Sequence, residues 1–555
     1  MRHALGPLLT LDVGTRQSEE SDIDDILAEF LGGRGVGTKL AFDRIPFDAD
    51  PLGPENRLYV AIGPMQASTT SFTGRTSATA LSPLTEGLLS SNAGGFVSRN
   101  IADTGYAAFE LVGRSDTPLW VHVTDDGVAF DPVPELAEAT VSTVVAHVGE
   151  ARGVGADAVV CIGPAGDHEV RFASMMTSGT RAFGRGGLGA VLGSKNVKCL
   201  TFAGDSPHRI EFPSVADEVH REAAESDHMM KRQGTAGLTE FANEIEALPT
   251  RYFSESSFEG ASAIGGDAIE EKKYKKGTCS SCAFACKLPT RNDAGLETEG
   301  PEFETVMAFG SNAGVDDLAA VMKANERCDE LGLDTISCGD VVSAYLASED
   351  ALGDAELLAD LVERIAYREG IGDTLAEGIH RIHDRLGVKD WTAKGMEFAA
   401  HDGRTLNGQA LAFATSNRGA DHLYGSMYVH EYPLVDRERA IDRDGVAGKA
   451  DLLVERENKN AVLDSAIACK FSRGFLTEAR LAALLDSTVE ELQAVGARIV
   501  DLERRFNNER GFDRADDTLP YELPGLASEL SAYYERRGWS DDGTVPTADS
   551  PERSG

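Results

Sequence analysis

The pattern of hydrophobic and polar positions changes near residue 206. Before that point, short β-branched or alternating runs recur between glycines, as over 58–62, 119–123 and 158–162. Runs of this length and composition predict strands, and the glycines between them predict tight turns or close backbone contacts. We therefore expect a mainly β region at the start of the chain.

After residue 206 the apolar positions follow helical spacing. This spacing predicts helices over 213–232, 316–332 and 354–368, the second ending at Gly332. At 555 residues the chain is too long for a single core. We predict an α+β fold, a mainly β N-terminal domain followed by two mainly helical ones, with the divisions 1–206, 207–403, 404–539 and a disordered tail over 540–555.

The charge of the chain excludes two classes of partner. The net charge is −38, from 91 acidic and 53 basic residues, and the acidic residues are spread from Glu19 to Glu552. Such a surface repels nucleic acid and anionic membranes. Adaptation to high salt explains it most simply, since salt screens the self-repulsion, and the alternative is a cationic partner.

The first twenty residues match neither a secretory signal nor a membrane anchor, and no apolar run is long enough for a transmembrane helix. We therefore expect a cytoplasmic protein. In that reducing compartment, clustered cysteines bind metal more often than they form disulfides.

Three of the eight cysteines, Cys279, Cys282 and Cys286, lie within eight residues at C-x2-C-x3-C spacing. Thiolates at this spacing can hold an iron–sulfur cluster or zinc, and a reduced, unligated group is the third alternative. A fourth ligand must come from elsewhere in the chain. The remaining cysteines are Cys161, Cys199, Cys328, Cys338 and Cys469.

Three glycine-containing segments stand out, 71–76, 90–95 and 181–196, and the third reads as a loop that suits the binding of phosphate. In the third, glycines allow backbone N–H groups to approach a ligand, and Arg181 and Arg185 can supply bidentate charge. The segment matches neither a Walker A loop nor the Rossmann pattern, so a glycine-rich surface turn is the alternative.

The order of motifs along nearly the whole chain resembles the aldehyde:ferredoxin oxidoreductase family, whose members are tungsten- or molybdenum-pterin enzymes. The motifs are Gly74-Arg75, Ser91 to Gly95, Arg181 to Asn196, the cysteine triplet, Gly300 to Thr305, Asp329 to Thr335, Ser416 to Leu423 and Asp464 to Lys470.

The resemblance implies two pterin dithiolenes holding one tungsten or molybdenum, with Mg as a candidate bridge between the pterin phosphates. A [4Fe–4S] cluster would lie beside one pterin. The implied cluster ligands are Cys279, Cys282, Cys286 and the distant Cys469, and the other four cysteines become buried small hydrophobes.

The resemblance also implies the residues that hold the pterins. Contacts to phosphate and pterin would come from Arg75, Asn92, Gly94, Arg181, Ala182, Gly184 and Arg185. Carboxylates accepting pterin N–H groups would be Asp329, Asp334 and Asp464, and Ala468 and Lys470 lie beside the fourth cysteine. Taken alone, Arg75 could be a surface arginine, Asp329 a solvated helix position and Asp334 a helix N-cap.

One motif departs from the family pattern. Residues 329–334 carry the usual Asp-x-x-Gly-Leu, whereas Ile467 and Ala468 replace Gly-Leu before Cys469. The loss of that glycine puts the backbone path beside Cys469 in doubt, although Asp464 and Cys469 keep their spacing.

The function implied by the resemblance is ferredoxin-dependent oxidation of a small aldehyde to its acid. At the matching positions, Glu304 would be the general base that activates water and His422 the hydrogen-bond donor to the substrate. Structural alternatives are a salt-bridged glutamate and a core histidine, and His430 is a competing histidine.

Alternative functions are action on a sugar or phosphorylated aldehyde, reduction of a carboxylate, or service as an iron–sulfur electron carrier. The sequence does not separate tungsten from molybdenum. Family members are often dimers, so a homodimer stays open. Four lysines, Lys272, Lys273, Lys275 and Lys276, precede the cysteines and could form a docking patch for ferredoxin or simply a solvated loop.

Overall fold

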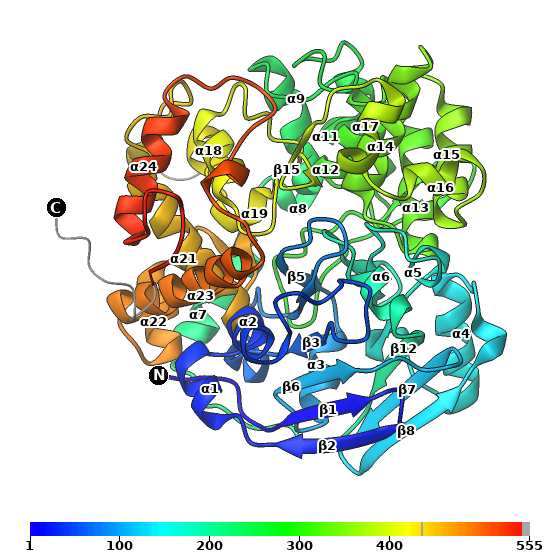
Figure 1. Cartoon of the computed structure of the whole chain (residues 1–555), viewed down its shortest axis with the longest axis vertical. Coiled ribbons are helices and arrows are strands. Elements are labelled where there is room, and N and C mark those ends of the chain that lie inside the picture. Colours follow the sequence, from blue (N-terminus) through cyan, green and yellow to red (C-terminus); the bar gives the residue numbers. More distant parts are fainter. Residues whose placement is uncertain (435–436, 547–555) are drawn as a thin grey trace.

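The computed structural model describes residues 1–434 and 437–546. A sheet-rich N-terminal part precedes a helical remainder, so the predicted α+β class is confirmed. In Figure 1 the sheets lie at the bottom, and the middle and C-terminal helices form two lobes above them.

The first sheet has six strands in the order β2-β1-β6-β3-β4-β5, with β1 parallel to β6. Its edge strand β2 is exposed and reads Gln-Ser-Glu-Glu-Ser, a charged edge that resists pairing with another chain. Strand β4 is buried almost throughout because α2, α3 and α6 pack against it. The strands are β1 (Leu8–Asp12), β2 (Gln17–Ser21), β3 (Leu58–Ala61), β4 (Arg75–Leu81), β5 (Leu88–Gly94) and β6 (Ala108–Val112).

The second sheet also has six strands, in the order β11-β10-β9-β12-β7-β8. They are β7 (Leu119–Thr124), β8 (Gly127–Pro132), β9 (Val159–Cys161), β10 (Met175–Thr177), β11 (Arg181–Phe183) and β12 (Val197–Phe202). The helices of this N-terminal part are α1 (Asp24–Phe30), α2 (Gly33–Arg44), α3 (Val97–Asp103), α4 (Val141–Arg152), α5 (Pro164–Asp167) and α6 (Leu188–Ser194).

The middle lobe is helical, with two short hairpins. Helix α7 (Val215–Glu225) packs instead against α22 (Glu478–Leu485), beside the C-terminal lobe. The helices of the middle lobe are α8 (Met230–Gln233), α9 (Thr239–Glu244), α10 (Ala261–Ile264), α11 (Gly266–Lys272), α12 (Phe303–Val306), α13 (Leu318–Leu331), α14 (Thr335–Ser348), α15 (Ala355–Ala366), α16 (Ile371–Leu375) and α17 (Ile379–Leu386). The hairpins pair β13 (Thr290–Arg291) with β14 (Glu297–Thr298) and β15 (Thr392–Ala393) with β16 (Met396–Glu397).

The C-terminal lobe is built on two long helices, α21 and α23, which pack against each other. Thr488 and Glu491 form a capping box that starts α23, as the spacing of these residue types allows. The helices are α18 (Asn407–Thr415), α19 (His422–Gly425), α20 (Tyr428–Glu431), α21 (Ala450–Ala466), α22 (Glu478–Leu485), α23 (Val489–Glu509) and α24 (Leu526–Arg537).

The hydrophobic core joins the sheets to both lobes. One set of buried apolar side chains runs from the two sheets into the middle helices, and a second lies between the first sheet, α2 and the C-terminal helices. A buried ion pair ties α2 to α23, since Arg34 lies 2.7 Å from Glu503 and stacks 3.5 Å over the ring of Tyr424. The N-terminal and C-terminal parts therefore form one packed unit.

The glycines of segment 181–196 suggest a loop, but the structure has a strand and a helix there. The segment forms β11 and then α6, because Leu188, Val191 and Leu192 are buried at helical spacing. A Cβ at Gly193 would lie 1.9 Å from the carbonyl oxygen of Gly166, so this glycine serves close packing of the helix rather than phosphate.

Two other expectations differ in extent. The helix expected over 213–232 is interrupted between α7 and α8. Residues 540–546, expected in the disordered tail, lie against α23, where Arg504 Nε donates to the Gly543 carbonyl at 2.8 Å. Residues 547–555 of that predicted tail lie outside the described residues.

The helices predicted over 316–332 and 354–368 are confirmed as α13 and α15. Asp317 and Asp354 cap their N-termini, each accepting backbone N–H bonds. Gly332 ends α13 with φ of 75° and ψ of 46°, the left-handed conformation typical of glycine after a helix.

Candidate active site

The cysteine triplet lies on a loop that two β-bridges hold at its base. Lys273 bridges Thr290, and Gly277 bridges Lys287, so the two ends of the loop run antiparallel. Within the loop Ser281 has φ of 56°. This left-handed backbone is costly for a residue with a Cβ, and it turns a short segment tightly enough to carry three thiols.

The loop is anchored to the first sheet, and two glycines make room for it. Ser280 N donates to the Gly95 carbonyl at 2.9 Å. A Cβ at Gly94 would lie 3.1 Å from Cys279 Sγ, and one at Gly74 would lie 2.9 Å from Ser280 N. The predicted Gly94 therefore lies directly against a predicted cluster ligand.

Cys469 lies on the same side of the molecule as the triplet. Its backbone N–H donates to the Phe72 carbonyl at 2.7 Å, and the side chains of Cys282, Cys286 and Cys469 pack against the apolar group formed by Phe72 and its neighbours. Burial raises the pKa of Cys286, and the neighbouring thiols raise it further. The fold thus brings the three thiols of the loop and the distant Cys469 to the same side of the molecule.

The spread of these thiols bears on what they can hold. Tetrahedral zinc, with Zn–S bonds of 2.3 Å, needs sulfurs about 3.8 Å apart. Within residues 1–434 and 437–546, no three of the cysteine thiols come within 4.8 Å of one another. As they stand in the structure, the thiols are therefore too far apart to ligate one tetrahedral zinc ion together.

The other four cysteines, Cys161, Cys199, Cys328 and Cys338, are buried and lie elsewhere. Cys161 and Cys199 face each other across β9 and β12, and burial raises the pKa of both thiols. All four are at most 1% exposed. They pack as small apolar residues.

Arg75 and Asn92 lie on paired strands next to the cysteines. Arg75 donates to Asn92 through Nε and Nη2, at 2.5 and 2.6 Å, and its Nη1 lies 3.9 Å from Cys469 Sγ. Asn92 Nδ2 is buried without a hydrogen-bond partner. Arg75 is thus no ordinary surface arginine.

Arg181 and Arg185 also carry unpartnered buried donors. Arg181 pairs with Glu299 at 2.9 Å, and Arg185 pairs with Asp334 at 3.1 Å, yet Nη1 of each arginine is buried without a hydrogen-bond partner. A Cβ at Gly184 would lie 3.5 Å from Asp334 Oδ1. Buried unpaired guanidinium donors fit an anionic group between them.

The strand residue Ala182 belongs to the same predicted set. It pairs with Met176 across β10 and β11, beside Arg181. Its side chain carries no hydrogen-bonding group, so any contact with a ligand would pass through its backbone.

The three predicted acceptor carboxylates differ in how many hydrogen bonds and ion pairs they already make with the protein. Asp334 is the N-cap of α14, which is the alternative role that the sequence allowed for it. It also pairs with Arg185. Asp464 contacts both Arg34 and Lys470. Asp329 receives only the Asn325 side chain, at 3.1 Å, and burial raises its pKa well above the ordinary value. Asp329 therefore has the most capacity left for a ligand.

Ile467 adopts the same left-handed backbone conformation as Gly332 at the matching position of the first motif. Ile467 ends α21 with φ of 60° and ψ of 33°, close to the conformation of Gly332 at the end of α13. A β-branched residue in this region is strained. Ile467 and Ala468 are both fully buried, so packing holds the strained conformation in place.

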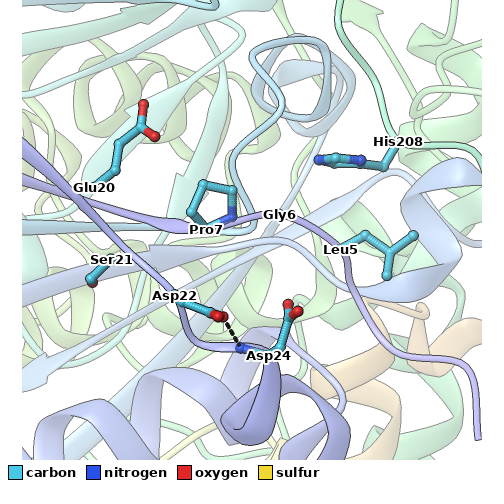
Figure 2. Close-up of a pocket in the computed structure, with 8 residues that line it drawn as sticks. All are labelled: Leu5, Gly6, Pro7, Glu20, Ser21, Asp22, Asp24 and His208. Carbon is cyan, nitrogen blue, oxygen red and sulfur yellow. Dashed lines mark hydrogen bonds between the residues drawn. The ribbon is translucent and has the colours of Figure 1, made fainter.

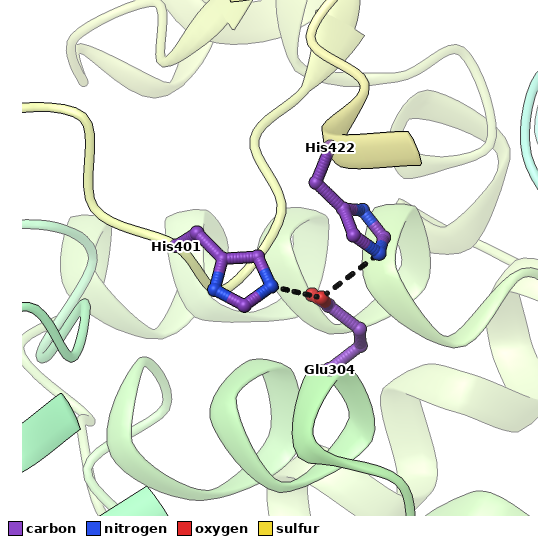
Figure 3. Close-up of side chains that lie close together, drawn as sticks. All are labelled: Glu304, His401 and His422. Carbon is purple, nitrogen blue, oxygen red and sulfur yellow. Dashed lines mark ion pairs between the residues drawn. The ribbon is translucent and has the colours of Figure 1, made fainter. Parts of the chain in front are cut away.

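Glu304 lies between two histidines (Figure 3). Its Oε1 is 3.2 Å from His422 Nε2 and 3.5 Å from His401 Nε2, and its Oε2 accepts the backbone N–H of Ala400 at 2.7 Å. Glu304 lies on α12, which continues into a π-helical turn over Met307–Ser311. Such turns are frequent at functional sites.

His401 is a member of this cluster that the motif analysis missed. Its ring stacks on Tyr428 at a centroid distance of 3.7 Å, and burial lowers its pKa well below the ordinary value. His401 is therefore neutral near pH 7. The only sequence signal is a histidine directly before an acidic residue in an otherwise apolar stretch, which is too weak to select it.

His430, the competing histidine, does not join the cluster. Its Nδ1 lies 2.8 Å from the Arg439 carbonyl, and burial lowers its pKa to about 4. A neutral Nδ1–H donating to that carbonyl gives His430 a structural role.

A small cavity of about 10 Å³ lies beside Cys286. Lys287 and Glu302 line it as an ion pair, and Lys287 lowers the pKa of Glu302. Glu302 keeps 41% of its side chain accessible although protein surrounds it closely, so this surface faces internal space.

A separate groove of about 480 Å³ opens at the surface near the chain start (Figure 2). Its lining includes Glu20, Asp22 and Asp24 opposite His208, and it contains none of the predicted site residues. Its carboxylates share the acidic character of the chain as a whole, so it identifies no ligand.

Comparison with known proteins gives consistent matches over the whole chain. Residues 8–204 match the model of the aldehyde ferredoxin oxidoreductase N-terminal domain, and residues 214–555 match domains 2 and 3. A tungsten-containing aldehyde ferredoxin oxidoreductase of Pyrococcus furiosus is 33% identical, covering 97% of this chain and 96% of that protein. One of Thermococcus kodakarensis is 32% identical, covering 99% and 98%.

A solved structure shares the fold at low sequence identity. The active-site complex of benzoyl coenzyme A reductase with 1,5-dienoyl-CoA aligns with a TM-score of 0.82 and 20% identity, over 98% of this chain and 96% of that one. Within residues 1–434 and 437–546, no helix has the length and apolar character needed to cross a bilayer.

Proposed function

Because this chain belongs to the aldehyde ferredoxin oxidoreductase family, we propose that it oxidises an aldehyde to the carboxylic acid and passes the electrons to ferredoxin. The observation that carries the proposal is Glu304 held between His401 and His422, beside residues suited to a pterin and a cluster. The names of the relatives supply the reaction class, and these side chains supply groups able to perform it.

The proposed cofactor is a bis-pterin centre of tungsten, or of molybdenum as the alternative. Its anionic groups would satisfy the unpartnered donors of Asn92, Arg181 and Arg185, and Asp329 would accept pterin N–H groups. Lys470 and Arg75 lie beside Cys469 and would add positive charge, and Mg could bridge the phosphates.

The proposed electron exit is a [4Fe–4S] cluster held by Cys279, Cys282, Cys286 and Cys469. Arg75 lies beside Cys469, with its Nη1 3.9 Å from the sulfur. A cation at this position offsets part of the negative charge of a thiolate-ligated cluster. A charged residue of the proposed pterin set would thus also lie beside the proposed cluster.

In the reaction, an aldehyde and a water molecule become a carboxylic acid, two protons and two electrons. The bound metal centre supplies Lewis acidity and accepts the electrons. Glu304 takes the proton from the water that attacks the carbonyl carbon, since its Oε1 is directed into the cluster of Figure 3. The C–O bond forms as the carbonyl π bond opens. The C–H bond then breaks as the C=O bond re-forms, which releases the second proton and the two electrons.

His422 donates a hydrogen bond to the carbonyl oxygen as negative charge develops there. It lies at the start of α19, where the N-cap Asp421 accepts backbone N–H groups and fixes the turn. His401 acts as a positioning residue, because its ring is locked on Tyr428 and lies against Glu304. The two imidazoles together confine the carboxylate to one orientation.

Metal analysis with an aldehyde assay tests the proposal. Purified enzyme should contain about one tungsten or molybdenum atom per four irons and reduce ferredoxin with an aldehyde. Iron without either metal would instead support a simple electron carrier. A panel that includes sugar and phosphorylated aldehydes, and a carboxylate with reduced ferredoxin, separates the remaining alternatives within the family.

A further inference from the structure

The lysine-rich segment before the cysteines divides into engaged and free cations. Lys272 pairs with Asp293 at 2.9 Å, and Lys273 Nζ donates to the Lys231 carbonyl at 2.6 Å. Lys275 and Lys276 are exposed, and no ion pair among residues 1–434 and 437–546 includes either of them. Two of the four charges are thus available to a partner.

One of these free lysines, Lys275, lies beside an exposed aromatic ring, together with Arg291, which is itself paired with Glu297. Tyr274 is 36% exposed, with Lys275 Nζ 5.2 Å from the centre of its ring and the Arg291 guanidinium 4.4 Å from it. Tyr274 also donates its hydroxyl to Glu297 at 2.7 Å, which holds the ring in place. Tyrosine and arginine are enriched at the centres of protein interfaces, and a ring already fixed loses little entropy on binding.

The same segment is attached to the proposed electron exit. Lys276 is followed by Gly277, which bridges Lys287 at the base of the cysteine loop, and Ser281 within the loop is exposed. A molecule resting on Tyr274 and Lys276 would therefore lie next to the loop that carries Cys279 and Cys282. This is the arrangement that electron transfer between two proteins requires.

We propose that Tyr274, Lys275, Lys276 and Arg291 form the docking surface for an acidic one-electron carrier, a ferredoxin. The inference rests on the proposed function and adds to it the place where the electrons leave. A protein of net charge −38 repels an acidic partner over most of its surface. Unpaired cations at one place select that place for contact and speed the encounter.

The test measures, by calorimetry at several salt concentrations, the affinity of a purified acidic ferredoxin for the metal-loaded protein. Lys275→Glu with Lys276→Glu reverses both free charges. We expect the affinity to fall about tenfold or more at low salt, with the two proteins converging as salt rises. Tyr274→Ala should weaken binding at all salt concentrations, because its contribution is mainly contact area.

A matched control reverses two charges elsewhere. Arg16 and Arg209 are both exposed, and Arg16 follows β1 in the chain and pairs with Asp116 at 3.4 Å. Arg16→Glu with Arg209→Glu changes the net charge equally. We expect this control to bind ferredoxin within about twofold of the unaltered protein. Equal weakening by both double variants would show a general charge effect and overturn the docking surface.

Turnover provides the second readout. The Lys275 and Lys276 double variant should lose ferredoxin reduction and keep the rate with a small uncharged quinone dye. Equal loss with both acceptors would refute docking. If the unaltered protein reduces the dye with an aldehyde but does not bind ferredoxin, the docking surface fails while the aldehyde chemistry stands. If it binds ferredoxin at this surface but oxidises no aldehyde, the proposed function fails and the docking surface stands.

Discussion

Replacing Glu304 by glutamine removes the proposed base with little change in shape. The amide oxygen of glutamine can still accept the Ala400 N–H that Oε2 accepts at 2.7 Å, so the local backbone keeps its contact. The other amide atom would take the place of Oε1 between His401 and His422, as an N–H donor that cannot accept a proton.

The expected cost follows from the step that is lost. General-base catalysis contributes about 10²–10⁴-fold to a rate. This corresponds to about 2.7–5.4 kcal/mol of activation free energy. We expect kcat to fall within that range and KM to change little, because the glutamine occupies the same volume and fold stability is retained.

The assay is steady-state aldehyde oxidation with ferredoxin and with a dye, on preparations matched for tungsten and iron content. His401→Phe is the companion variant, since phenylalanine keeps the stacking on Tyr428 and removes Nε2. For this positioning residue we expect kcat to fall about tenfold at unchanged KM. That is a smaller loss than the base itself would produce.

A glutamine variant with full metal content and a rate within about threefold of the unaltered enzyme would refute the role of Glu304. A variant that lost its metal would be judged by its rate per bound tungsten. If His401→Phe were slower than Glu304→Gln, the base would have to be reassigned to His401.

The remaining predictions concern the cluster, the strained turn and pH. Cys469→Ala should lower bound iron severely and remove the cluster absorbance, whereas Cys328→Ala, a buried cysteine outside the set, should keep full iron content; equal iron in both would contradict the fourth ligand. Ile467→Gly and Ile467→Ala both lose buried surface, but of the two only glycine adopts φ of 60° without strain. The glycine variant should therefore be more stable than the alanine variant by about 1 kcal/mol in urea unfolding. The reverse order would contradict a strained turn. The pKa of His430 falls from its ordinary 6.5 to about 4 on folding, so its contribution is complete above pH 6.5 and is lost as pH falls toward 4. Between these limits the unaltered protein should lose up to about 3 kcal/mol more of its unfolding free energy than His430→Asn, measured by denaturant unfolding across that range, and parallel pH curves would refute this.

The sequence could predict the parts of the site that depend on residue type and order. Cysteine spacing and motif order selected four thiols that the fold brings to one side of the molecule, and Glu304 and His422, which lie 3.2 Å apart. Strand and helix patterns located β3, β7, α13 and α15, because their periodicity reflects burial on one or two faces.

The sequence could not predict contacts made by residues far apart in the chain without a motif. His401 is recognised as part of the site only through its packing on Tyr428, and Arg34 stands out only through its burial between Glu503 and Asp464. The sequence around each residue carries no pattern that predicts these contacts. Glycines in 181–196 had two readings, ligand approach and close helix packing, and only the fold distinguishes them. The chain path at Ile467 could not be predicted, because tertiary packing there overrides local backbone preference.

The distribution of the four proposed cluster ligands has a consequence for biosynthesis. The triplet is translated before Glu304, His401 and His422, and Cys469 is translated after all three. During synthesis the first three thiols therefore leave the ribosome without their partner, and the set is completed only when α21 has formed and its end at Ile467 has turned toward the Phe72 carbonyl. Insertion of the cluster would thus be a late step that reports on the folding of the C-terminal lobe. A chain truncated before that helix would contain the proposed base Glu304 but only three of the four proposed cluster ligands.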